Sequence, residues 1–392
     1  MQTIPSGTPA SPGSKPIIWI WHDCNVHLAP EDSLLAKACD KLRFECERSQ
    51  SNLVLYPTSL LQRRLILGYG AALALLQQLE QLGVLTPLEH GFSHDSQGFV
   101  GVNPMMIFYR PEQVAPNAGT ISPSAFKPGQ VMDDWHASGL INAGNVCSFE
   151  PVSRGDIKRV HNPQMVDDVL DLRRRNGFRN MDAQIAASLP YTSGSMLAAA
   201  RWTLSNRYPT CSPTSGFHHA SFNEPEGYCT FNGLMVTAVK LLDEGLVRSV
   251  AILDCDVHEG NGTEDIIDRL GLHKQIQHHS MGYHFQTREQ AGPAAVHFET
   301  WLQHALAQCA SADLVLYQAS ADPHVDDPLG GVLTEHELLR RDDAVFRTLR
   351  HTPLVWNLAG GYQRDEAGSI EPVLAIHRMT MLAWMRVCLQ PR

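Results

Sequence analysis

The sequence lacks three features that would assign it to a specialised class of protein. It has no Cys-x-x-Cys pair among its nine cysteines, so neither a disulfide framework nor a cysteine zinc finger is indicated. It has no apolar run long enough to cross a membrane. It has no basic excess, since 31 Lys and Arg stand against 41 Asp and Glu, a net charge of −10. This acidic balance argues against direct nucleic-acid binding through a basic face.

These absences predict a reduced, cytoplasmic protein that makes no membrane contact. Residues 1–15 are rich in Pro, Ser, Gly and Thr and lack the apolar segment of a secretory signal, which predicts a disordered tail. A length of 392 residues suffices for one large α/β domain or two ordinary ones. The composition is that of a globular protein with ample material for a core.

Apolar runs alternate with helical patterns in the second half of the chain. The runs expected to form buried strands are 249–253, 314–318 and 354–358. The helices expected between them lie near 230–246, 297–310 and 335–350. This rhythm predicts a mostly parallel sheet flanked by helices.

The first half of the chain shows weaker patterns of the same kind. Strands are expected at 17–21, 105–109 and 146–150. Helices are expected at about 30–48, 58–83, 133–139, 163–175 and 193–204.

The most informative stretch follows the run 249–253. Asp254, Asp256 and His258 occupy alternate positions, so their side chains leave one face of an extended chain. Open α/β sheets place ligands beyond the carboxyl ends of buried strands such as this one. Asp and His at this spacing suit a divalent metal such as zinc. An ordinary loop of turn and capping residues is the alternative.

Three further polar clusters lie beside predicted elements: His218-His219, Asp322, and Gly360-Gly361-Tyr362. Successive parallel strands end on the same edge of a sheet, so these clusters can converge. Taken singly, each is better explained as an ordinary loop or turn. Taken together, they favour a site.

These motifs resemble those of the zinc-dependent histone deacetylase and acetylpolyamine amidohydrolase superfamily. They occur in the family's order as Gly-Phe-His218-His219-Ala, Glu226-Gly227-Tyr228, Asp254-Cys-Asp256-Val-His258-Glu-Gly-Asn261, Asp322-Pro-His and Gly360-Gly361-Tyr362. The resemblance implies an arginase/deacetylase-like three-layer α/β fold with a central, mostly parallel sheet flanked by helices. It leaves 16–104 without a clear counterpart. That segment is therefore expected to be an N-terminal extension packed on a catalytic domain at 105–392, as a lid or an oligomer contact.

The resemblance also implies a role for each matched residue. The zinc ligands would be Asp256, His258 and Asp322, which leaves a position open for water and substrate. The proton-transfer pair would be His218 and His219, oriented by Asp254 and Asn261 respectively. The oxyanion would be steadied by the hydroxyl of Tyr362. The substrate pocket would be lined by Gly227, Tyr228, Gly360 and Gly361.

The implied activity is removal of an acetyl or related acyl group from an amine by metal-activated water. The substrate would be acetyl-lysine in a protein or peptide, or alternatively an acetylated polyamine or another small amide. A non-catalytic acyl-lysine-binding protein on the same fold is the alternative of another class. The family also implies a structural K⁺ held by Asp254. Its acidic rim residue has no clear match here, and Asp182 is a candidate.

Overall fold

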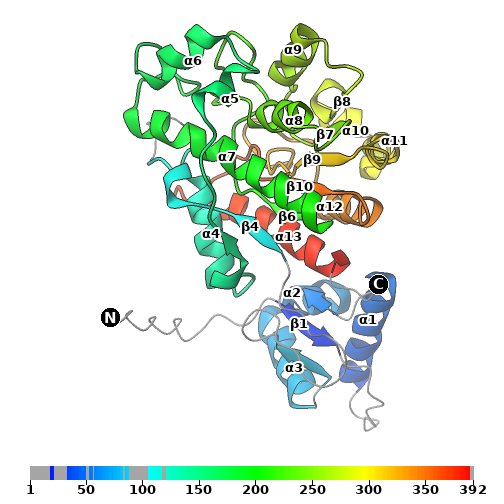
Figure 1. Cartoon of the computed structure of the whole chain (residues 1–392). Helices are drawn as coiled ribbons and strands as arrows, with labels where there is room; N and C mark the ends of the chain where they lie inside the picture. Colours follow the sequence, from blue (N-terminus) through cyan, green and yellow to red (C-terminus); the bar gives the residue numbers. More distant parts are fainter. Residues whose placement is uncertain are drawn as a thin grey trace, which may run out of the picture. The chain divides into compact units, whose positions relative to one another are not determined.

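A computed structural model describes residues 18–21, 33–49, 53–55, 57–82, 84–87, 105–116 and 121–388. The chain forms two compact units, each with its own core (Figure 1). The described residues up to Pro87 and Trp135–Asn142 belong to the smaller unit, and the others belong to the larger one. None of the helices in these ranges is both long and apolar enough to span a bilayer. The predicted tail at 1–15 lies outside the described residues.

The smaller unit combines a three-stranded antiparallel sheet with three helices. Its strands are β1 (Ile18–Trp21), β2 (Leu53–Leu55) and β3 (Leu85–Pro87), with β1 in the middle. Its helices are α1 (Ser33–Ser49), α2 (Pro57–Leu65) and α3 (Tyr69–Gln81). The strand predicted at 17–21 and the helix predicted at about 30–48 are therefore confirmed as β1 and α1. How this unit serves the larger one stays a prediction.

The single helix predicted over 58–83 is wrong, because the structure has two helices there. Helix α2 ends at Leu65 and α3 begins at Tyr69. Between them Ile66 has a φ of 56°, in the left-handed region that a right-handed helix cannot contain. Gly68 is extended, with φ −67° and ψ 158°, and precedes the first turn of α3. Gly68 indicates a helix break in the sequence. The break was not predicted, because the apolar repeat continues on both sides of Gly68.

The larger unit is built on a seven-stranded parallel sheet with the order β5-β4-β6-β10-β9-β7-β8. Its strands are β4 (Met106–Phe108), β5 (Val146–Cys147), β6 (Thr210–Cys211), β7 (Val250–Asp254), β8 (Ile276–Ser280), β9 (Leu314–Gln318) and β10 (Leu354–Asn357). Gln318 is in register with Asp254 on one side and Asn357 on the other. The three central strands thus end level with one another, and the loops that follow them share an edge.

Helices cover both faces of this sheet (Figure 1). They are α4 (Lys127–Ala137), α5 (Arg154–Lys158), α6 (Pro163–Leu170), α7 (Ala183–Asn206), α8 (Gly233–Asp243), α9 (Asn261–Leu270), α10 (Arg288–Ala291), α11 (Val296–Cys309), α12 (Glu335–Thr348) and α13 (Glu371–Cys388). Helix α7 packs on β4, β6 and β10 and against α8, whereas α11, α12 and α13 contact one another in sequence. The predicted three-layer α/β fold is confirmed.

Alternate residues of the central strands face the two helical layers. Ile252 of β7 and Leu316 of β9 belong to the core beneath α7 and α8. Tyr317 of β9 and Trp356 of β10 instead pack against Phe346 of α12, with ring centroids 6.2 and 6.3 Å apart. Strands covered on both faces are expected to be apolar throughout, which is why these runs were readable from the sequence.

Several predicted boundaries differ from the structure. Helix α7 begins at Ala183 rather than near 193 and continues through Pro190. Helix α6 ends at Leu170 rather than near 175, and the left-handed φ of 60° at Leu172 prevents its continuation. The short helix predicted at 133–139 is the end of α4, which starts at Lys127. Strand β8 was not predicted, because its Gln-His-His-Ser sequence lacks the apolar character of the other strands.

The core beneath α7 and α8 should limit the stability of the larger unit. Leu316→Ala removes a fully buried side chain and should lower the free energy of unfolding by about 2–5 kcal/mol. The matched control Leu246→Ala affects a side chain that is 53% exposed and should change it by no more than about 0.5 kcal/mol. Urea unfolding followed by near-UV circular dichroism measures both. Equal effects of the two substitutions would contradict this account of the core.

Candidate metal centre and active site

The loops after four parallel strands bring the predicted site residues together. His218 and His219 follow β6, and Asp256 and His258 follow β7. The third predicted ligand, Asp322, follows β9. Gly360, Gly361 and Tyr362 follow β10. The sequence did not predict β6, so the strand that positions the histidine pair became visible only in the structure.

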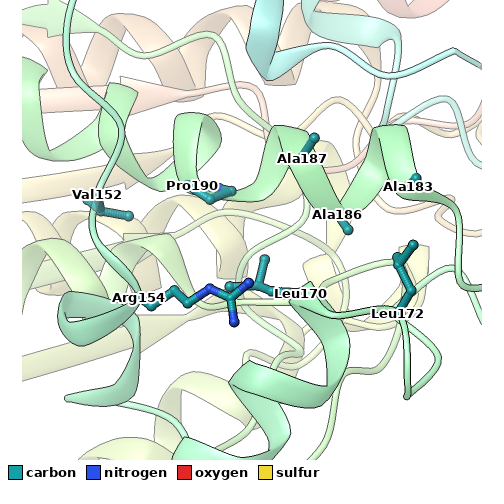
Figure 2. A pocket seen from close by; sticks show the side chains of 8 residues that line it. All are labelled: Val152, Arg154, Leu170, Leu172, Ala183, Ala186, Ala187 and Pro190. Atoms are coloured by element: carbon teal, nitrogen blue, oxygen red, sulfur yellow. The ribbon is translucent and has the colours of Figure 1, made fainter.

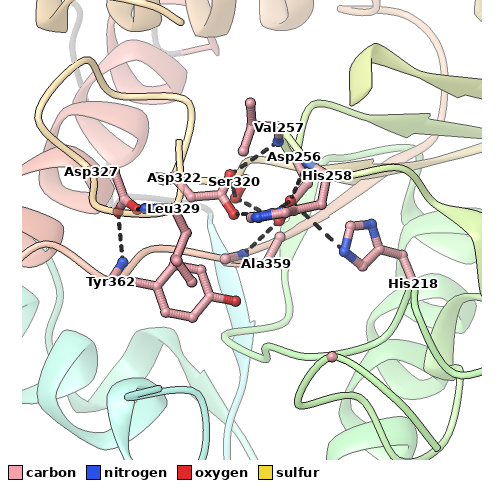
Figure 3. A network of polar contacts seen from close by, with 12 residues as sticks. His218, Asp256, Val257, His258, Ser320, Asp322, Asp327, Leu329, Ala359 and Tyr362 are labelled. Atoms are coloured by element: carbon pink, nitrogen blue, oxygen red, sulfur yellow. Dashed lines mark hydrogen bonds and ion pairs between the residues drawn. The ribbon is translucent and has the colours of Figure 1, made fainter. Parts of the chain in front are cut away.

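The three predicted metal ligands form one compact cluster (Figure 3). Donor atoms of Asp256, His258 and Asp322 all lie within 4.8 Å of one another. His258 Nδ1 is 2.9 Å from Asp256 Oδ1 and 3.2 Å from Asp322 Oδ2. Both carboxylates are buried, whereas His258 is half-buried. Access to the cluster is therefore from the side of His258.

The carboxylate oxygens that point away from His258 are held by other groups. Asp256 Oδ2 accepts a hydrogen bond from the amide of Gly360 at 3.0 Å, and Asp322 Oδ1 accepts one from the amide of Val257 at 3.1 Å. Ser320 Oγ lies 2.8 Å from each of these oxygens and donates its single proton to one of them. Each carboxylate thus keeps its other oxygen for the shared space beside His258.

The electrostatics of this cluster call for a cation. Burial, together with the charge of Asp256, raises the pKa of Asp322 to about 7. Burial also opposes ionisation of Asp256, but His218 and His258 hold its pKa well below the usual range. Burial lowers the pKa of His258, yet its hydrogen bonds to both carboxylates outweigh this and raise it to about 11. A proton on His258 therefore offsets the negative charge of the two carboxylates.

The donor set fits a divalent metal ion. Two carboxylates and one imidazole are hard and intermediate ligands that zinc accepts, and three protein ligands leave a position open, as catalytic zinc sites do. The metal would displace the proton of His258 and supply the positive charge that the two buried carboxylates require. A second group of similar donors, Glu264, Asp268 and His273, lies on the surface, where Asp268 and His273 already form an ion pair at 2.8 Å.

The two histidines of the predicted proton-transfer pair lie side by side, with ring centroids 4.1 Å apart. His218 Nδ1 contacts Asp254 Oδ2 at 2.8 Å, and His219 Nδ1 contacts Asn261 Oδ1 at 2.6 Å. Burial lowers the pKa of His218, but Asp254 and Asp256 outweigh it and raise it to about 9. Burial and the charge of His218 lower the pKa of His219 to about 4, and the hydrogen bond to Asn261, which raises it, does not offset them. The different partners therefore give the two imidazoles opposite protonation states at neutral pH.

A histidine that the sequence did not single out stands behind this pair. The His278 side chain is 2% exposed, with Nδ1 2.9 Å from Glu264 Oε2 and Nε2 3.9 Å from Asp254 Oδ2. Asp254 also accepts a hydrogen bond from the amide of Asp256 at 3.1 Å through Oδ1. The carboxylate of Asp254 is thus occupied by His218 and the backbone. The K⁺ site predicted at Asp254 stays a prediction.

The loop that carries Tyr362 is fixed by two residues outside the predicted catalytic set. Asp327 Oδ2 accepts hydrogen bonds from the amides of Tyr362 and Gln363 at 2.7 and 3.1 Å. The fully buried Lys127 donates to the carbonyls of Ala359 and Gly360 at 2.6 and 2.8 Å. Asp327 belongs to the loop that also carries Asp322. In the structure it joins that loop to the loop of Tyr362.

Two glycines at the site leave no room for a side chain. A Cβ at Gly360 would collide with the carboxylates of Asp256 and Asp322. Gly227 has a φ of 55°, and a Cβ there would collide with the ring of His219. Gly361, with a φ of 136°, also occupies a conformation that favours glycine. Gly227 and Gly360 are glycine because neighbouring side chains approach their backbone closely. Gly361 is glycine because of its backbone conformation.

Aromatic rings stand around the half-buried His258. The ring of Tyr362 is 6.3 Å from that of His258 and 6.0 Å from that of Tyr228. Tyr228 has a φ of 62°, an uncommon conformation for a large residue, and packs against Phe178 at 5.8 Å. Phe178 was missed by sequence reasoning, because a lone aromatic in the Arg-rich stretch before Asp182 carries no periodic signal.

The remaining sequence candidates are located by their contacts. Asp182 caps helix α7, and its carboxylate accepts hydrogen bonds from the amides of Gln184 and Ile185 at 2.8 and 2.9 Å. Both hydrogen bonds go to Oδ1, and the role of Asp182 as rim residue stays a prediction. Cys255 is fully buried on the other face of the strand, where Arg341 approaches its carbonyl oxygen at 3.5 Å.

A separate surface hollow of about 330 Å³ lies between α6 and α7 (Figure 2). Leu170, Leu172 and Ala186 give it apolar walls, and Arg154 stands at its edge. The guanidinium of Arg154 is already paired with Asp167 and Asp171, at 3.4 and 2.7 Å. No titratable group of the metal cluster lines this hollow.

Comparison with known proteins agrees with the fold. Residues 124–287 match the histone deacetylase domain family. The chain is 30% identical to acetylpolyamine amidohydrolase 2 of Pseudomonas aeruginosa over 185 residues, 41% of this chain and 52% of that protein. It is 29% identical to acetylpolyamine amidohydrolase of Mycoplana ramosa, over 41% of this chain and 53% of that protein. The chain thus spans about half the length of these curated relatives.

Solved structures show the same fold at lower sequence identity. The HDA15 HD domain has a TM-score of 0.59 at 16% identity and covers 74% of this chain and 90% of its own. Acetylpolyamine aminohydrolase from Burkholderia pseudomallei has a TM-score of 0.53 at 17% identity and covers 72% of this chain and 98% of its own. The sheet with a candidate metal centre at its carboxyl edge defines a class of α/β proteins. Within it, the chain is similar to the histone deacetylase and acetylpolyamine amidohydrolase superfamily.

Loss of one ligand should weaken metal binding. Asp322→Asn, which keeps the shape of the side chain, should raise the Kd for Zn²⁺ at least about tenfold. Zinc affinity of the wild type should also rise with pH, because the proton on His258 competes with the metal. Competition with a chromogenic chelator measures both effects.

The matched control for Asp322→Asn is Asp268→Asn, which removes a carboxylate from the surface group with Glu264 and His273. It should leave the Kd unchanged. Equal zinc affinity of wild type and Asp322→Asn, or equal weakening by the control, would assign the metal to a different site.

Proposed function

We propose that the protein is a zinc-dependent amidohydrolase that removes an acetyl or related acyl group from an amine such as acetyl-lysine. The observation that carries the proposal is the cluster of Asp256, His258 and Asp322 with the differently paired His218 and His219 beside it. The family match supports it, because the matched family and relatives are named as deacetylases and amidohydrolases.

The metal would be held by Asp256, His258 and Asp322, whose converging donor atoms support this assignment. When bound, it would polarise the amide carbonyl and acidify water. The hydrogen bonds from Gly360 and Val257 fix the orientation of the two carboxylates. A fixed orientation matters because ligands that rotate would not keep the metal and the substrate aligned.

The histidine pair would manage the protons. His219 is neutral at pH 7, so it can accept the proton of the attacking water at its free Nε2 and return it to the leaving amine. His218 is held protonated by Asp254 and contributes positive charge beside the reacting carbonyl. Opposite environments on neighbouring imidazoles are a known way to separate such roles.

The hydroxyl of Tyr362 would donate a hydrogen bond to the developing oxyanion. The pKa of Tyr362 is raised well above its usual value by burial and by the charges of Asp322 and Asp256, so the phenol keeps its proton. A phenol that stays neutral can donate throughout the reaction. Tyr228 and Gly227 would line the channel for the acyl chain, and Phe178 would support that wall.

Activity should depend on the metal and its ligands. Asp256→Ala and treatment with a strong chelator should each abolish deacylation, and zinc should restore activity only to the chelated wild type. A parallel assay on acetyl-lysine peptides, longer acyl-lysine peptides and acetylpolyamines identifies the substrate class. Robust hydrolysis by metal-free protein would contradict the mechanism. Zinc binding without turnover of any of these amides would favour the non-catalytic alternative.

The oxyanion role of Tyr362 can be tested separately. Tyr362→Phe should lower kcat roughly 10²–10³-fold, the range for loss of one oxyanion donor, and should leave zinc content unchanged. The matched control Tyr283→Phe removes a phenol that is 46% exposed and should leave kcat unchanged. Steady-state kinetics with metal analysis of each variant decides the matter. An unaltered kcat in Tyr362→Phe would assign the oxyanion to another donor.

A further inference from the structure

The smaller unit contains a helix–turn–helix. Helices α2 and α3 contact each other, and both contact α1. The turn between them consists of Ile66, Leu67 and Gly68. Two packed helices joined by a three- or four-residue turn with a glycine are the arrangement that many proteins use to place the second helix in the major groove of DNA.

Helix α3 has one buried face and one exposed face. Its buried positions are Ala72, Leu75, Leu76 and Leu79, which belong to the core of the smaller unit. Its opposite face presents Gly70, Ala74, Gln77, Gln78 and Gln81, all exposed. The exposed surface thus combines small residues with amide side chains, and its one charged side chain among the described residues is Glu80, near the end of the helix.

The helix before the turn ends in positive charge. Arg63 and Arg64 occupy the last turn of α2 and are exposed. Arg64 pairs with Glu45 of α1 at 3.1 Å, and no acidic partner of Arg63 is found among the residues that the structure describes. Between Pro57 and Leu82 the acidic residue is Glu80, near the end of α3. The predicted absence of a nucleic-acid partner relied on the net charge of the whole chain, which does not describe this segment.

We propose that the helix–turn–helix of the smaller unit binds double-stranded DNA. Helix α3 would enter the major groove, with Arg63 and Arg64 at the phosphate backbone. The glutamines of α3 would read base edges, because the amide of Gln matches the donor and acceptor of adenine in the major groove. Gly70 and Ala74 allow the helix to approach the bases closely. This binding function is independent of the proposed deacylation.

The first test measures binding of the full-length protein to a fluorescent random-sequence duplex by anisotropy at several salt concentrations. Wild type should bind with a Kd near the micromolar range at low salt, and log Kd should depend linearly on log salt. Arg63→Ala/Arg64→Ala should raise the Kd at least about tenfold and reduce the salt slope by about two. Its deacylation rate should be unchanged.

The matched control is Arg248→Ala/Lys274→Ala, which removes two exposed positive charges from the larger unit. It should leave both the Kd and the salt slope unchanged. Circular dichroism verifies that each variant is folded. A single-stranded DNA and an RNA duplex of the same length serve as competing ligands and should bind more weakly.

The second test asks whether α3 reads sequence. Selection of bound duplexes from a random pool should enrich a motif for the wild type. Gln77→Ala/Gln78→Ala should abolish or change that motif and leave the salt slope of non-specific binding unaltered. The proposal is overturned if the wild-type protein fails to bind duplex DNA at low salt. It is also overturned by an Arg63→Ala/Arg64→Ala variant that binds as well as wild type, or by a motif that survives the glutamine substitutions.

Discussion

The site depends on one electrostatic constraint, which is the burial of two carboxylates in a shared space. Asp256 and Asp322 are almost fully removed from water, and isolated buried charges of one sign are strongly unfavourable. The surrounding polar groups each offset part of this unfavourable burial of charge. Backbone amides and Ser320 bind the outer oxygens, and His258 stands between the inner ones. His218 faces Asp256 from the other side, with Nε2 3.8 Å from Oδ1.

The same principle explains the two states of the histidine pair. His218 and His219 are adjacent in sequence and nearly in contact, yet one is paired with a carboxylate and the other with an amide. A charged neighbour makes it costly to protonate the second ring. Despite burial, the carboxylates of Asp254 and Asp256 raise the pKa of His218, whereas burial and the charge of His218 lower the pKa of His219, so proton binding is divided between two chemically identical side chains.

The sequence could predict the parts of this structure that follow from periodicity and spacing. The apolar runs of β7, β9 and β10 identified the centre of the sheet, and the alternation from Asp254 to His258 identified the ligand face. Residues that act through tertiary contacts could not be predicted. Lys127 of α4 and His278 of β8 reach the site from elements far from it in sequence, and Ser320 and Asp327 lie near Asp322 in sequence but act through contacts that only the fold reveals. The break at Gly68 was overlooked because local apolar character did not change there.

The register of the central strands has a consequence for how the site can vary. Asp254, Gln318 and Asn357 are aligned by the backbone ladder, so the starting points of the three site-bearing loops are set by the sheet and not by the loops. Insertions farther along these loops would lengthen the surface segments and leave the origins of Asp256, Asp322 and Tyr362 in place. The surface rims of these loops can therefore vary in length while the cluster of Asp256, His258 and Asp322 keeps its position.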